Sequence, residues 1–129
     1  MHRLSAITLV GGVIFGLTAC STDSAAQLDD LRERFVVAGG VCSDWAPLGK
    51  PLALAAQTCA EGATLVVFNS TEDRADFIKS ELETNEQIRA RTHVIVSEDT
   101  WLVIDTLAVI VRVMPPMGGM ISGRNGANP

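Results

Sequence analysis

An uncharged apolar run near the N-terminus most constrains this 129-residue chain, because it decides how much of the sequence is left to fold. One basic residue, Arg3, precedes the run, which extends from Leu4 to Leu17 without a charged side chain. A membrane-spanning helix needs about 20 apolar residues, whereas these 14 residues are typical of the core of a cleaved export signal. We therefore expect residues 1–19 to be removed, which leaves 110 residues for one small domain.

The run ends in Leu17-Thr18-Ala19-Cys20, a large apolar residue, two small residues and a cysteine. This sequence resembles the lipobox of bacterial lipoproteins. The resemblance implies that the signal peptidase recognises Leu17, Thr18 and Ala19 and cuts before Cys20, and that Cys20 carries diacylglycerol, a palmitate-type lipid. Two acyl chains hold a protein on a membrane stably, whereas one chain does so only marginally. We expect attachment to the extracytoplasmic face of the cell membrane, with a retained anchor or plain secretion as alternatives.

Once Cys20 is assigned to lipid, Cys42 and Cys59 remain as a pair. The space outside the cytoplasmic membrane permits disulfides, and a small domain gains stability from one. We predict a Cys42–Cys59 disulfide. Two reduced buried thiols, or a metal or redox pair, stay open as alternatives.

Two helices are indicated by capping residues followed by apolar residues at helical spacing. Ser24 and Gln27 form a candidate capping box for a helix over 25–38, which Gly39 and Gly40 would end. A second helix should start after Ser70 and run from 71 to about 83. Its core-facing stripe is predicted to consist of Ala75, Ile78 and Leu82, with Phe77 alongside.

Three segments read as strands, because β-branched and aromatic residues dominate them. They are 64–68, predicted to be central, and 93–96 and 101–104, joined by a hairpin turn over 97–100. The segment 41–51 is expected to be a loop, since it contains two prolines and Gly49.

Other segments give mixed signals. Residues 52–58 fit either a helical turn or an edge strand, and the pattern over 84–91 does not distinguish helix, strand and loop. Residues 106–114 are predicted to be helical, and Pro115-Pro116 to stop that helix.

The resulting prediction is an α+β fold, with a small antiparallel sheet of about three strands, two or three helices and one disulfide. The expected division is a signal peptide over 1–19, a leash over 20–23, the domain over 24–114 and a flexible tail over 115–129.

A second resemblance covers most of the mature chain. It rests on Ala38-Gly39-Gly40-Val41-Cys42, Thr58-Cys59, the strand ending at Phe68, the helix with Arg74 and the strand with Trp101. The order is similar to that of a group of small uncharacterised lipoproteins from high-GC Gram-positive bacteria. That group implies no assigned activity.

The search for chemistry in the mature chain centres on His93, its only histidine. Ser97, Glu98 and Asp99 follow, and Asp105 lies further on, yet no hydrolase elbow motif or established metal-ligand spacing accompanies them. A strand with a polar turn is the simpler interpretation. We therefore expect no catalytic residues, no metal site and no cofactor apart from the lipid on Cys20.

Trp101 is expected to fill the core, whereas Trp45 either covers the disulfide or contacts a partner. The net charge of −5 disfavours nucleic acid as a partner. We expect a lipid-anchored envelope protein with a non-enzymatic binding or interaction role, and another envelope protein is the candidate partner. A small hydrolase that uses His93 and a phage-exclusion or host-defence lipoprotein are the alternatives.

Overall fold

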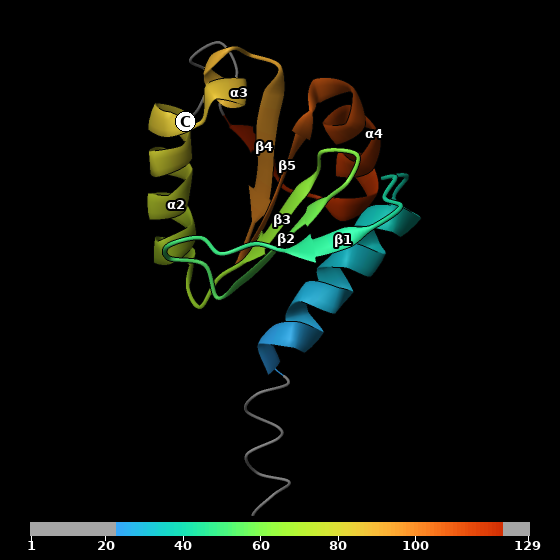
Figure 1. Cartoon of the computed structure of the whole chain (residues 1–129), viewed down its shortest axis with the longest axis horizontal. Coiled ribbons are helices and arrows are strands. Elements are labelled where there is room, and N and C mark those ends of the chain that lie inside the picture. Colours follow the sequence, from blue (N-terminus) through green and yellow to red (C-terminus); the bar gives the residue numbers. More distant parts are fainter. Residues whose placement is uncertain (1–22, 123–129) are drawn as a thin grey trace, which may run out of the picture.

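The computed structural model describes residues 23–122, and these form a six-stranded antiparallel sheet with helices on both of its faces (Figure 1). The sheet order is β1-β2-β3-β5-β4-β6. The strands are β1 (Trp45–Pro47), β2 (Ala55–Cys59), β3 (Thr64–Val67), β4 (His93–Glu98), β5 (Trp101–Thr106) and β6 (Met120–Ser122). The helices are the N-terminal helix (helical over 23–37), α2 (Thr71–Thr84), α3 (Glu86–Arg89) and α4 (Leu107–Met117).

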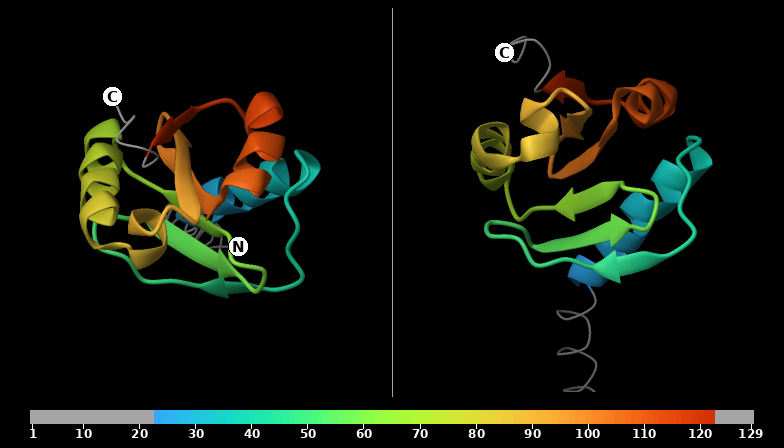
Figure 2. Two further views of the ribbon diagram at one scale, coloured as in Figure 1. Left: turned by 90° about the horizontal axis from the view of Figure 1, so that it is seen from above. Right: turned by 45° about the horizontal axis from the view of Figure 1, so that its top comes forward.

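Two hydrophobic cores lie on opposite faces of the sheet. Figure 2 shows the helices that cover these two faces. On one face, the N-terminal helix and α4 pack against alternate strand residues such as Leu65 and Val103. On the other face, α2 and α3 pack against the intervening residues, such as Val66 and Leu102. Strands covered on both faces are apolar at consecutive positions, which explains the unbroken apolar runs of β3, β4 and β5.

The predicted α+β class and the Cys42–Cys59 disulfide are confirmed, but the sheet has six strands where about three were expected. The additional strands are β1, β2 and β6. The segment 52–58, left open between helix and edge strand, contributes most of β2, which lies inside the sheet. The loop expected over 41–51 contains β1.

The predicted ends of the first helix need correction. Asp23 is already helical, so Ser24 lies within the helix and does not cap it, and the leash expected over 20–23 does not include Asp23. Residues 20–22 and the signal segment lie outside the described residues.

The start of α2 is confirmed at the predicted cap. The Ser70 hydroxyl accepts a hydrogen bond of 3.1 Å from the Asp73 N–H, and Glu72 and Asp73 stand in the first turn, where the helix dipole favours acids. Residues 84–91, where the pattern was undecided, begin with the last residue of α2 and contain α3. The two helices meet at Asn85, which caps the end of α2 and the start of α3.

The third predicted helix is confirmed as α4, and the Thr106 hydroxyl caps it by accepting from the Val109 N–H. The prediction that Pro115-Pro116 stops this helix is wrong: it continues through both prolines to Met117, and a 2.7 Å bond from the Gly118 N–H to the Met114 carbonyl closes its last turn.

Residues 123–129 of the flexible tail expected over 115–129 lie outside the described residues. For 115–122 the prediction is wrong, because residues 115–117 belong to α4 and the chain after α4 forms β6. Gly118 and Gly119, with φ of 87° and 101°, turn it back so that Met120–Ser122 pairs with β4. A side chain at Gly119 would meet the Ser97 carbonyl oxygen at 2.9 Å, so the return requires glycine there.

Candidate ligand-binding cleft

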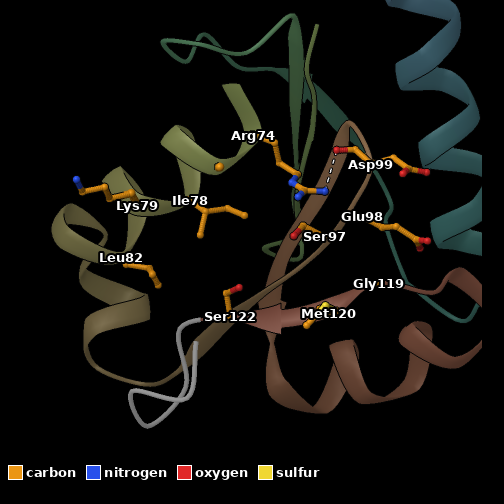
Figure 3. Close-up of a pocket in the computed structure, with 11 residues that line it drawn as sticks. Arg74, Ile78, Lys79, Leu82, Ser97, Glu98, Asp99, Gly119, Met120 and Ser122 are labelled. Carbon is orange, nitrogen blue, oxygen red and sulfur yellow. Dashed lines mark hydrogen bonds between the residues drawn. The ribbon is translucent and has the colours of Figure 1, made fainter. Parts of the chain in front are cut away.

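A cleft of about 640 Å³ lies between α2, the end of the β4–β5 hairpin and β6 (Figure 3). Small-molecule sites typically measure about 300–1,000 Å³. The floor of the cleft is formed by Ser97 on β4 and Met120 on β6, which pair opposite each other. Ser97 lies two residues after Ile95, so both side chains are on the same face of the sheet, the face that carries Ile95. The cleft therefore lies on the α2 face of the sheet.

One wall of the cleft is a stripe on α2 formed by Arg74, Ile78 and Leu82. Residues four apart in a helix lie on the same side, so one cationic group is followed by two apolar side chains. The fully buried face of α2 carries Phe77 and Glu81 instead. The predicted core stripe is thus corrected: Ala75 is exposed, and Ile78 and Leu82 pack only at the margin of the core and also face the cleft.

Arg74 is held in the cleft by its guanidinium group, as Figure 3 shows. Its Nη1 donates a 2.8 Å hydrogen bond to the backbone carbonyl of Asp99, at the tip of the hairpin. Its Nε is shielded from solvent and has no hydrogen-bond partner among the described residues. No carboxylate of residues 23–122 forms an ion pair with Arg74, since the two ion pairs found there join Arg32 to Asp29 and Lys50 to Glu81.

The other side of the cleft consists of the hairpin tip and β6. Glu98 and Asp99 are exposed, and Figure 3 shows their side chains directed away from the Arg74 guanidinium. Met120 is 64% exposed and Ser122 is buried. An apolar wall and a few polar groups converge here, which is the usual composition of a small-molecule site.

The disulfide lies away from this cleft. Cys42 precedes β1 and Cys59 ends β2, with their Cα atoms 5.7 Å apart. Glu61 lies beside the two sulfurs, and its carboxylate accepts a 2.9 Å bond from the Ser43 N–H, which lowers the pKa of Glu61. Ligand atoms of Cys42, Cys59 and Glu61 lie within 4.8 Å of one another, but two bonded sulfurs offer no thiolate to a metal ion.

Trp45 pairs opposite Cys59 across β1 and β2. Its ring makes an edge-on contact with buried Phe35, with centroids 6.1 Å apart and an interplanar angle of 76°. Trp45 therefore lies at the margin of the core beside the strand position of Cys59, and it does not belong to the cleft. That its ring covers the disulfide stays a prediction. A contact between Trp45 and a partner stays a prediction.

Trp101 fills the core as predicted, and the Arg34 guanidinium carbon lies 5.2 Å above its ring.

His93 and Ser97 stand at opposite ends of β4, so the structure does not bring them together. Four residues of strand separate them by about 13 Å. The His93 Nδ1 lies 3.1 Å from the Thr92 hydroxyl. Asp105 pairs opposite Val94, next to His93 on β4, and is buried; burial raises the pKa of Asp105 despite a 2.7 Å bond from the Thr106 N–H and the charge of His93.

The site residues predicted for lipidation and signal cleavage, Leu17 to Cys20, lie outside the described residues. None of the helices in the described range is long and apolar enough to cross a bilayer. Sequence reasoning missed the cleft, although the spacing of Arg74, Ile78 and Leu82 was the available signal. Comparisons with protein-family models, with curated proteins and with solved structures found no match to this chain.

Proposed function

We propose that this chain is a lipid-anchored protein of the extracytoplasmic face of the cell membrane that binds a small ligand, without catalysis, in the cleft between α2 and β6. The observation that carries the binding role is the cleft itself, with the shielded and incompletely bonded Arg74 in its wall. The lipobox-like sequence before Cys20 supports the anchor. The Cys42–Cys59 disulfide supports a location outside the reducing cytoplasm.

The position of the cleft suits a tethered protein. Cys20 lies three residues before Asp23, a distance of at most about 11 Å along the chain. The N-terminal helix that follows packs on one face of the sheet, whereas the cleft opens on the other. An anchor on the first face leaves the cleft accessible to ligands.

The hydrolase alternative has weaker support. A nucleophile and its general base must come within hydrogen-bond reach, and about 13 Å of strand separates His93 from Ser97. His93 also does not line the cleft.

The anchor is tested by the intact mass of the protein purified from membranes. The expected mass is that of residues 20–129 plus diacylglycerol, and a Cys20→Ser variant should remain uncleaved. A chain that retains Met1, or a mature chain without lipid, would contradict the anchor.

The cleft is tested by native mass spectrometry of the same preparation in mild detergent. We expect a bound small molecule that is lost in Met120→Trp, whose larger side chain would occupy the cleft. Val111→Trp is the matched control, since Val111 is 56% exposed on α4, away from the cleft. Retention of the molecule in Met120→Trp, or no bound molecule in the wild type, would contradict the proposed site.

A further inference from the structure

We infer that the ligand of the cleft is an amphiphilic carboxylate: an acidic head group that pairs with Arg74, joined to an unbranched apolar tail that lies along Ile78 and Leu82. This inference rests on the proposed function and adds the chemical class of the ligand. Its evidence is the state of Arg74, the charges around it and the apolar wall beyond it.

Arg74 has more hydrogen-bond donors than its partners among the described residues use. A guanidinium has five N–H donors in a planar fork that matches a carboxylate. In this structure Nη1 bonds to the Asp99 carbonyl, which fixes the plane of the group, while Nε is shielded and lacks a partner among the described residues. Because Nε is shielded, a ligand in the cleft does not reach it; the donors left for a carboxylate are the N–H groups of Nη1 and Nη2 that form no other hydrogen bond among the described residues.

The positive charge of Arg74 has no anionic partner among the described residues. The Asp99 carbonyl is neutral, so the positive charge of Arg74 is not compensated by an ion pair within residues 23–122. Lys79 also lines the cleft, but its side chain is exposed and Figure 3 shows it directed away from Arg74, so Arg74 is the cation that faces the cleft. The carboxylates of Glu98 and Asp99 point away from the guanidinium and are exposed, so solvent screens the repulsion between them and an anionic ligand beside Arg74. The local field therefore favours a single anionic group beside Arg74.

Ile78 and Leu82 form an apolar wall of the cleft beyond Arg74. Ile78 and Leu82 continue the stripe from Arg74, and eight residues of helix span about 12 Å. Met120 lies across from them on β6 with an exposed, flexible thioether side chain, which adapts readily to apolar ligands. A cationic group followed by about 12 Å of apolar wall fits a medium-length acyl chain with an acidic head better than a compact ion.

The test uses the full chain in its membrane and two photoreactive probes, octanoic acid and octanol, each with a diazirine at the end of its tail. The two probes share the tail and differ in the head group, so membrane partitioning alone cannot produce site-specific labelling that depends on Arg74. Labelled positions are found by peptide mass spectrometry. We expect the acid to label peptides that contain Leu82 or Met120, and the alcohol to do so at least about tenfold less, the loss typical of an absent charged partner.

Three variants complete the test. Arg74→Gln should reduce labelling by the acid about tenfold or more, and Arg74→Lys, which keeps the charge but not the fork, should fall between. Arg89→Gln is the control, because Arg89 is an exposed arginine on α3 outside the cleft. Melting temperatures show whether each variant folds, and Arg74→Lys decides the test if Arg74→Gln does not fold.

Equal labelling by acid and alcohol, or labelling that the Arg74 variants leave unchanged, would overturn the carboxylate inference while the cleft remains a binding site. The same holds if native mass spectrometry finds a cleft ligand without an acidic group. A cleft that holds no molecule in either measurement would overturn the proposed function as well.

Discussion

Gly40 illustrates how tightly single residues are fixed in this domain. A methyl group at this position would overlap the ring of Phe35, a residue of the N-terminal helix whose side chain is fully buried. The backbone of Gly40 is tied to the same residue by a 2.9 Å bond from its N–H to the Phe35 carbonyl, so the chain cannot easily move away. The glycine is therefore required by a close approach and not only by the end of the helix.

We expect Gly40→Ala to lower the free energy of unfolding by about 1–3 kcal/mol, the usual cost of overpacking a core. Gly49→Ala is the control, because nothing lies within 4 Å of the added group there. Its expected change is within about 0.5 kcal/mol of zero. Urea denaturation measures both, and equal effects of the two substitutions would show that the Phe35 contact is not the cause.

Asp105 is a buried carboxyl group that opposes folding at neutral pH. Burial raises the pKa of Asp105 above its unfolded value, so between the two values the folded state holds more protons. The contribution of Asp105 to stability is therefore fully present below the unfolded pKa and is lost as pH rises through the folded pKa. His93 and Arg112 oppose this effect through their charges but do not outweigh burial.

We expect Asp105→Asn to raise the melting temperature by a few degrees at pH 7, since the amide oxygen can still accept from the Thr106 N–H without carrying a charge. The gain should shrink toward zero as the pH approaches 3.8, where the wild-type group becomes protonated in both states. Thermal unfolding of both proteins across this range is the measurement. A gain that is the same at pH 7 and pH 4 would mean that burial of the charge is not responsible.

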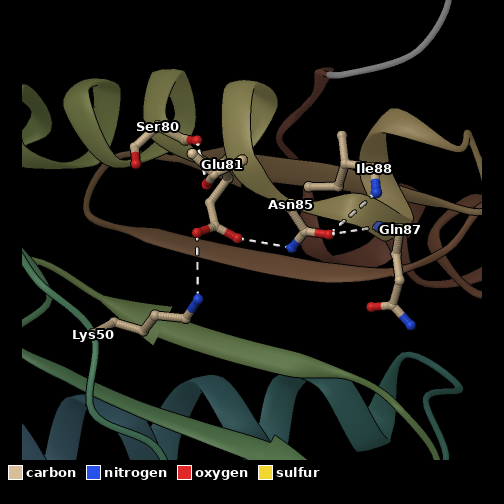
Figure 4. A network of polar contacts seen from close by, with 7 residues as sticks. Lys50, Ser80, Glu81, Asn85, Gln87 and Ile88 are labelled. Carbon is tan, nitrogen blue, oxygen red and sulfur yellow. Dashed lines mark hydrogen bonds and ion pairs between the residues drawn. The ribbon is translucent and has the colours of Figure 1, made fainter.

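At the scale of elements, a small polar network connects the loop before β2 with α2 and α3 (Figure 4). The buried Glu81 carboxylate accepts from Lys50 Nζ at 3.3 Å and from Asn85 Nδ2 at 2.8 Å. The other end of the Asn85 amide accepts from the Gln87 and Ile88 N–H groups and starts α3. One carboxylate thus orients the residue that ends one helix and begins the next.

Glu81→Ala should lower the free energy of unfolding by about 1–3 kcal/mol, because Lys50 and the Asn85 amide lose their partner. Glu83→Ala, an exposed glutamate on the same helix, should change it by less than about 0.5 kcal/mol. Denaturant titration compares the two. Amide hydrogen exchange of Ile88 should also accelerate more in Glu81→Ala than in Glu83→Ala, and similar rates in both would argue against the coupling of α2 to α3.

Elements specified by local signals were predicted from the sequence. Ser70 caps α2 and Thr106 caps α4 through bonds to residues three positions away, so a short window contains the information. β1 and β6 were missed because each has only three residues and is defined by pairing with a distant or already formed strand. Nothing within Met120–Ser122 itself indicates that β4 offers a free edge.

The cleft was missed for a related reason. The apolar residues of α2 were all assigned to the core, because a pattern does not show how wide the sheet beneath a helix is. β6 extends the sheet beyond the part that α2 covers. Ile78 and Leu82 therefore face the cleft between α2 and β6 and pack only partly against the core. The position of Arg74 gains meaning only from the Asp99 carbonyl, which lies 25 residues further along the chain.

At the scale of the whole molecule, the disulfide links the segment before β1 to the end of β2 at one edge of the sheet. Cys42 lies before the edge strand β1, and Cys59 ends β2 within the core that the N-terminal helix covers. The bridge therefore keeps β1 and Trp45 against the rest of the sheet, where a three-residue strand has few bonds of its own. The cleft lies at the other edge, at β6, so the bridge and the cleft are at opposite ends of the sheet order.

This separation makes a specific prediction for Cys42→Ser combined with Cys59→Ser. The bridge spans a sequence separation of 17, for which loop-closure entropy gives a stabilisation of about 3 kcal/mol. We expect the double variant to lose roughly that amount in urea denaturation and reductant to lower the stability of the wild type by a similar amount. Reductant should leave the double variant unchanged, which is the internal control. Because β6 and α2 do not depend on the bridge, the variant that remains folded at low temperature should still bind the cleft ligand. Loss of binding in a folded double variant would show that the two edges of the sheet are coupled.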